Sequence, residues 1–127
     1  MIAVDASLLV AWLWPEDRHH DAADDFLTER AGEDLILHPL TLAEVLVGGV
    51  RLDRGTEMLA DMQQLGIRVA SPGDGEPLRL ATLRVTTGLK MPDCCVLDTA
   101  ITHQADLATF DDALAVAARN AGLDVLT

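Results

Sequence analysis

Apolar and polar positions alternate with two different periods along the chain. Runs of two or three apolar residues, such as 35–37, are typical of short buried strands, and longer stretches with apolar residues three and four positions apart are typical of amphipathic helices. The predicted strands cover 2–4, 35–37, 67–69, 107–109 and 125–126. The predicted helices cover 7–13, 17–31, a segment that begins at 42, and then 53–65, 74–87, 92–104 and 111 or 112 to about 121. This order predicts an α/β fold with a central, mostly parallel sheet of four to five short strands flanked by helices.

Capping residues define the predicted helix starts. Ser7 is expected to cap the first helix, and Asp74 is expected to open the helix that ends before Gly88. Thr41 is followed three residues later by Glu44, which is the spacing of a capping box, so the third helix is expected to begin at Leu42.

Length and composition indicate one domain over residues 1–127. Half of the residues are hydrophobic, which excludes a disordered chain. No apolar run approaches the ~20 residues of a membrane span, and the start has no basic lead, so we expect a soluble cytoplasmic protein. Cys94 and Cys95 are adjacent, which excludes an ordinary disulfide framework, and both are expected to be small buried residues.

The net charge of −12 does not favour long-range attraction of nucleic acid. If the substrate is RNA, a bound divalent metal ion and a few basic side chains must offset the repulsion. The same acidity favours a basic protein partner.

Four acidic residues lie where a parallel sheet would bring them together. Asp5 ends the first strand and Asp111 follows the fourth, while Glu44 and Asp93 lie near helix starts. In open α/β sheets ligands bind at the carboxyl ends of strands. Clustered carboxylates repel one another, and a hard cation with a preference for oxygen, such as Mg²⁺, removes that repulsion.

Each acid also has a purely structural role open to it. Asp5 could cap the first helix, Glu44 could complete the capping box, and Asp93 and Asp111 suit the positive end of a helix dipole. Asp112 competes with Asp111 for either role. We favour the shared site because four independent coincidences are less expected than one cluster.

Other polar and aromatic residues are less specific. His19 and His20 match no transition-metal spacing and are interpreted as a solvated helix start. Lys90, three residues before an acid, is the best candidate for a phosphate contact. Trp12 and Trp14 either belong to the core or line a groove for a partner.

The order of the acidic motifs resembles the PIN-domain family over nearly the whole chain, and its short members, the VapC-type toxins, in particular. The matching segments are Ile2-Ala3-Val4-Asp5-Ala6-Ser7, Thr41-Leu42-Ala43-Glu44-Val45, Met91-Pro92-Asp93-Cys94 and Thr109-Phe110-Asp111.

The resemblance implies an endoribonuclease that depends on Mg²⁺ or Mn²⁺. It assigns the metal-site acids to Asp5, Glu44, Asp93 and Asp111. Ser7 and Thr109 match the hydroxyl positions of the family and are expected to orient these acids or to bind water.

One acid departs from the family pattern. Asp98 stands where many relatives have a small apolar residue, and it lies about 140° around the helix from Asp93. Direct sharing of one metal by the two is therefore not expected, whereas a supporting role for Asp98 or Asp112 is.

The resemblance also implies partners: an RNA substrate, a VapB-like antitoxin that covers the acidic site, and a second copy of the chain in a homodimer. Operator DNA would be bound only through the antitoxin complex. Two alternatives stay open, a Mg²⁺-binding receiver-type signalling domain and a catalytically inactive PIN module that binds a partner.

Overall fold

The computed structural model describes residues 1–127. The helices are α1 (Ala6–Leu13), α2 (His20–Glu29), α3 (Pro39–Arg51), α4 (Gly55–Gln64), α5 (Glu76–Thr87), α6 (Met91–Thr102) and α7 (Asp112–Asn120). The strands are β1 (Ile2–Val4), β2 (Leu35–Leu37), β3 (Ile67–Val69) and β4 (Asp106–Ala108). The predicted α/β class is confirmed. None of the helices has the length and apolarity that crossing a membrane requires.

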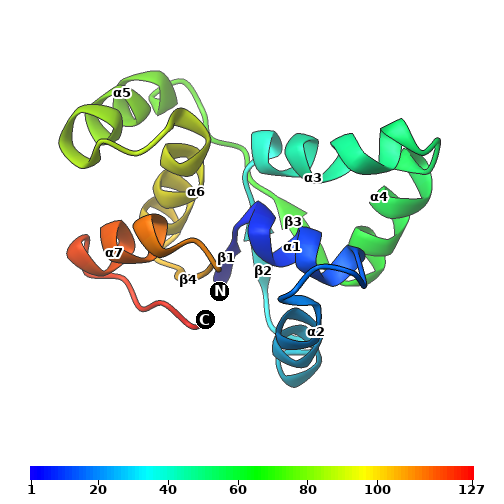
Figure 1. Cartoon of the computed structure of the whole chain (residues 1–127). Helices are drawn as coiled ribbons and strands as arrows, with labels where there is room; N and C mark the ends of the chain where they lie inside the picture. The colour runs from blue at the N-terminus through cyan, green and yellow to red at the C-terminus, as the bar shows by residue number, and fades with distance from the viewer.

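The sheet has the order β3-β2-β1-β4 and all of its strand pairs are parallel. Parallel neighbours need crossover connections, which the helices supply. In Figure 1, α1 to α4 lie on one side of the sheet and α5 to α7 on the other. The predicted strand at 125–126 is reduced to one parallel bridge between Leu107 and Val125. All four strands end at the same edge, where the candidate site lies.

Alternation along the strands divides the core in two. Ile2 and Val4 pack into a cluster with residues of α1 to α4, whereas Ala3 and Ile36 pack into a second cluster with residues of α6 and α7. Successive side chains of a strand point to opposite faces, so each face of the sheet is covered by its own set of helices.

Helix α6 is the most deeply buried helix, with seven consecutive buried residues, Cys94–Ala100. A helix that is buried on every side is packed by the core rather than lying on the surface. Cys94 and Cys95 are both buried and unpaired, as the sequence predicts.

The capping predictions for the first and third helices were wrong. Asp5, not Ser7, is the N-cap of α1. Helix α3 begins at Pro39 instead of Leu42, because Pro39 suits the first helical turn and the ring of His38 accepts a hydrogen bond from the Leu40 N–H. Thr41 therefore lies inside the helix, where its buried hydroxyl has no hydrogen-bond partner.

Helices α2, α4 and α5 also start later than predicted, and α4 begins at 55 instead of 53. Helix α2 starts at His20 because Asp17 accepts a hydrogen bond from the His19 N–H in a turn that precedes it. Helix α5 starts at Glu76 rather than Asp74, after Gly73, whose φ of 80° is incompatible with a right-handed helix.

Candidate metal centre

Two of the predicted acids follow neighbouring strands. Asp5 follows β1 directly, and Asp111 caps α7 just after β4, its carboxylate accepting a hydrogen bond from the Leu114 N–H at 2.8 Å. Because β1 and β4 are adjacent and parallel, their carboxyl ends place both acids at one edge of the sheet. Glu44 reaches this edge from α3, and Asp93 reaches it from the first turn of α6.

Negative charges of the neighbouring acids raise the pKa values of Asp93 and Glu44. Burial, followed by the negative charges of Asp5, Asp111 and Glu44, raises the pKa of Asp93, and the positive charge of Lys90 offsets part of this effect. Glu44 is more exposed, yet its partial burial and the charge of Asp5 also raise its pKa. The structure thus brings the other three acids into electrostatic range of Asp93. No hydrogen bond stabilises the ionised form of Glu44 or Asp93.

Asp5 differs from Glu44 and Asp93 because its carboxylate accepts several hydrogen bonds. Its carboxylate is buried and accepts hydrogen bonds from the Ala6 N–H at 2.8 Å, from the Ser7 hydroxyl at 2.8 Å and from the Thr109 hydroxyl at 2.7 Å. A carboxylate has about four acceptor positions, so these three donors fix its orientation and leave room for another ligand. Ser7 and Thr109 therefore both act on Asp5.

The same hydroxyls join the ends of β1 and β4. The Ser7 hydroxyl accepts a hydrogen bond from the Phe110 N–H at 3.0 Å, and the Thr109 hydroxyl accepts one from the Asp111 N–H at 2.9 Å. Each hydroxyl donates to Asp5 and accepts from the backbone that leads to Asp111. This network sets the position of one acid relative to the other.

Aromatic stacking adds a contact that the sequence did not suggest. The ring of His19 stacks on that of Phe110, with centroids 4.5 Å apart. His20 instead bonds the Ala11 carbonyl oxygen through Nδ1 at 2.8 Å. The two adjacent histidines are thus engaged separately, and one of them packs beside the residue that precedes Asp111.

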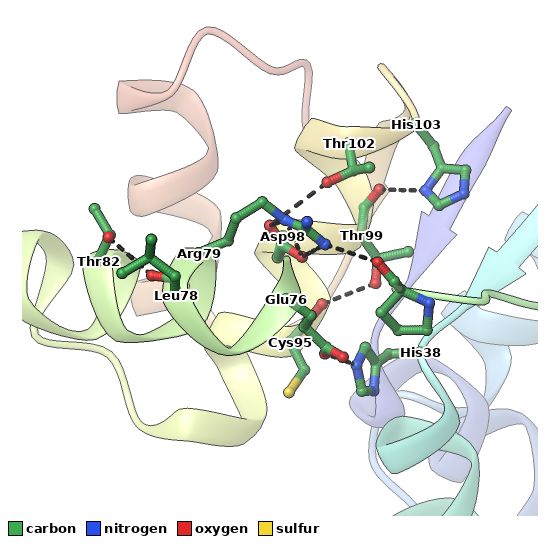
Figure 2. A network of polar contacts seen from close by, with 11 residues as sticks. His38, Glu76, Leu78, Arg79, Thr82, Cys95, Asp98, Thr99, Thr102 and His103 are labelled. Carbon is green, nitrogen blue, oxygen red and sulfur yellow. Dashed lines mark hydrogen bonds and ion pairs between the residues drawn. The ribbon is translucent and has the colours of Figure 1, made fainter. Parts of the chain in front are cut away.

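Asp98 and Asp112 lie apart from the network around Asp5. Asp98 is 4% exposed and forms a two-pronged ion pair with Arg79, whose Nε lies 3.0 Å from Oδ1 and whose second nitrogen lies 3.1 Å from Oδ2. Arg79 also donates to the Pro72 carbonyl oxygen at 3.0 Å. Figure 2 shows this ion pair joining α5 to α6. Asp112 lies in the first turn of α7 with its side chain exposed.

A second polar group carries no signal in the sequence. His38, Glu76 and Cys95 have potential ligand atoms that all lie within 4.8 Å of one another (Figure 2). These residues come from three separate segments, and no spacing along the chain connects them. No three of the four acids have ligand oxygens within 4.8 Å of one another.

Hydrogen bonding makes this second group unsuited to a metal. Nδ1 of His38 accepts the hydrogen bond from the Leu40 N–H at 2.9 Å, so a neutral ring must carry its proton on Nε2. That proton faces Glu76, with which Nε2 is in contact. Burial, followed by the charge of Glu76, raises the pKa of Cys95 to about 11, which disfavours the loss of the proton that metal binding by its sulfur would require. The contact is a structural link between α3 and α5.

The four acids, in contrast, form an oxygen-only donor set. Hard divalent cations prefer carboxylate and water oxygens, and a positive charge among these acids would oppose the repulsion that raises the pKa of Asp93. The donor chemistry at this edge therefore fits Mg²⁺ or Mn²⁺.

Solved structures with a similar fold cover nearly the whole chain. A toxin–antitoxin complex from Klebsiella pneumoniae is 21% identical with a TM-score of 0.74, covering 99% of this chain and 95% of that one. VapC20 from Mycobacterium tuberculosis, described as a toxin that cleaves the sarcin–ricin loop, is 16% identical with a TM-score of 0.78, covering 92% and 95%. VapBC2 from Rickettsia felis, bound to a DNA fragment from its promoter, is 16% identical with a TM-score of 0.75, covering 99% and 98%.

Sequence comparison gives the family directly. No curated protein sequence matches the chain significantly. The family model of the PIN domain, however, matches residues 2–120, which span β1 to α7 and include all four acids. This chain therefore belongs to the PIN-domain family.

Proposed function

We propose that the protein is a Mg²⁺-dependent endoribonuclease, with Mn²⁺ as a substitute ion, and that it is the toxin of a VapBC-type toxin–antitoxin pair. The observation that carries this proposal is the convergence of Asp5, Glu44 and Asp111 on Asp93 at one edge of the sheet. The PIN family is a nuclease family, and similar folds include a toxin described as cleaving RNA of the sarcin–ricin loop.

The residues of the site would divide the work. A bound cation lowers the pKa of the attacking water and neutralises charge that develops on the phosphate. Asp93 and Glu44 would hold the ion from α6 and α3. Asp5 would do so in the orientation set by its hydroxyl partners, and Asp111 from the cap of α7. Lys90, whose charge acts on Asp93, would contact a substrate phosphate.

Cleavage of RNA by purified protein tests the proposal. Asp93→Asn should lower the Mg²⁺-dependent rate by at least about 100-fold, since even residues that only support a metal ligand contribute 10- to 100-fold. Asp21→Asn is the matched control, because Asp21 is also an acid in the first turn of a helix. Chelation should stop cleavage by the wild type and Mg²⁺ should restore it. An Asp93→Asn protein that cleaves at the wild-type rate would contradict the proposal.

The net charge of −12 favours a basic protein partner. We propose a VapB-like antitoxin whose basic segment covers the acids, a homodimeric toxin, and operator DNA binding only by the antitoxin complex, all within the cytoplasm. The Rickettsia felis neighbour supports the binding of operator DNA by the antitoxin complex, since it is a VapBC complex on promoter DNA. A basic antitoxin peptide should inhibit cleavage, and the inhibition should weaken as salt rises.

The alternatives give different results. The PIN match provides no support for a receiver-type domain, which would form a stable aspartyl phosphate on Asp5 with a small phosphodonor. A catalytically inactive PIN module would show neither metal-dependent thermal stabilisation nor growth arrest on expression, and would cleave no RNA.

A further inference from the structure

We propose that Thr127 is a positioning residue for the acid site, acting through Thr109. The segment 124–127 runs beside β4: the Leu107 N–H donates to the Asp124 carbonyl oxygen at 2.9 Å, and the Leu126 N–H donates to the Leu107 carbonyl oxygen at 2.9 Å. These two bonds pair Leu107 with Val125 in the parallel sense. Only this one step of ladder forms, so the backbone of Thr109 needs other partners.

A side chain takes over at the next step. Continuation of the parallel ladder would have the Thr109 N–H donate to the Leu126 carbonyl oxygen. The hydroxyl of Thr127 binds both groups of Thr109 instead. It accepts a hydrogen bond from the Thr109 N–H at 2.8 Å and donates one to the Thr109 carbonyl oxygen. One hydroxyl thus holds the peptide groups on both sides of a single residue.

Thr109 passes this constraint to the acids. It is 2% exposed, and its own hydroxyl donates to Asp5 and accepts from the Asp111 N–H. Thr127 is therefore connected by two successive hydrogen bonds to a carboxylate of the site and to the cap of α7. Its role in metal binding rests on the proposed function, whereas its role in ordering the turn does not.

Two substitutions separate the hydroxyl from the shape of the side chain. Thr127→Val keeps the branched shape and removes the hydroxyl, and Thr127→Ser keeps the hydroxyl. Thr82→Val is the matched control, because the hydroxyl of Thr82 also bonds a backbone carbonyl oxygen, that of Leu78, on exposed α5.

The first readout is amide hydrogen exchange in metal-free protein. Thr127→Val should accelerate exchange at Thr109 and Asp111 by about 10-fold, while Leu107, held by the ladder, should change little. Thr127→Ser and Thr82→Val should exchange at these amides as the wild type does. Unchanged exchange at Thr109 in Thr127→Val would overturn the proposal.

The second readout is calorimetric titration with Mg²⁺. Thr127→Val should bind about 10-fold more weakly, and Thr127→Ser should bind within about twofold of the wild type. Faster exchange with unchanged Mg²⁺ affinity would also overturn the positioning role, because the hydroxyl would then order the turn alone. If wild-type protein binds neither Mg²⁺ nor Mn²⁺, the proposed function fails, and amide exchange still decides whether Thr127 holds Thr109.

Discussion

The two carboxylates of α6 lie in opposite environments. Asp93, in the first turn, faces three other acids, and burial together with their charges raises its pKa. Asp98, five residues later, is buried more deeply but is matched by the guanidinium of Arg79. A buried carboxylate left without a partner destabilises a fold, and the chain solves this problem at one position and not at the other. The cation proposed above would offset the repulsion that remains around Asp93 after the charge of Lys90 is counted.

The largest effect on stability is expected from removing Arg79, the ion-pair partner of Asp98. Arg79→Met should lower the midpoint of urea unfolding by about 1 M, because the Asp98 carboxylate stays buried without its partner. The shift is smaller than for a fully buried pair because the side chain of Arg79 is 38% exposed. Arg84→Met, on the same helix with an exposed side chain, is the control and should move the midpoint by less than about 0.3 M.

A double substitution sharpens this result. Arg79→Met with Asp98→Leu removes both charges and should recover most of the lost stability. If Arg79→Met alone unfolds at the wild-type urea concentration, the ion pair does not compensate Asp98 and the contrast along α6 is lost.

Removing the charge of Asp93 should instead increase the stability of the metal-free protein. Asp93→Asn should raise the free energy of unfolding of metal-free protein by about 0.5–1 kcal/mol, since it removes a charge that repels its neighbours and water screens part of this repulsion. Mg²⁺ should raise the melting temperature of the wild type and not that of the variant. A metal-free variant that melts below the wild type would argue that Asp93 serves mainly to stabilise the positive end of α6, in whose first turn it lies.

The stability of the metal-free protein should depend on pH through Glu44 and Asp93. Because the folded-state pKa values of Glu44 and Asp93 are raised, the folded state binds more protons than the unfolded state above about pH 4, and their contribution to stability falls as pH rises through the raised values. The stability advantage of the variant Glu44→Gln/Asp93→Asn over metal-free wild type should therefore be larger at pH 7 than at pH 4. Thermal melts at both pH values measure it, and an equal difference at both would exclude the raised pKa values.

The smallest effect is expected at His38. Glu76→Gln keeps an acceptor for the Nε2 proton and should change the free energy of unfolding by less than about 0.5 kcal/mol. Zn²⁺ should not raise the melting temperature of the wild type beyond the effect of Mg²⁺. A Zn²⁺-specific rise that disappears in Glu76→Gln would mean that His38, Glu76 and Cys95 bind metal after all.

The sequence predicted the positions of the strand-end acids better than the helix starts and the contacts that hold these acids. The positions of Asp5 and Asp111 follow from alternating strands and helices, because parallel strands end at a common edge. Helix starts were harder, since Asp5 and Ser7 are both good caps, and the hydroxyl of Ser7 is instead used by Asp5 and the Phe110 N–H.

The remaining contacts join residues far apart along the chain. His38 meets Glu76, and Arg79 meets Asp98, across separate elements, and neither pair has a periodic pattern that marks it. The hydroxyl of Thr127 reaches Thr109 only because the ladder beside β4 stops one step earlier. Tertiary packing decides such contacts, and local propensity carries no information about them.

The burial of α6 on every side has a consequence for how the protein can evolve. A helix that is buried over Cys94–Ala100 cannot tilt or slide without repacking the core cluster that it shares with β1, β2, β4 and α7. Asp93, in the first turn of this helix, is therefore held in a fixed position. If the protein is the nuclease proposed above, new cleavage preferences would arise in the exposed loops and helix ends around Asp93, where replacements are tolerated.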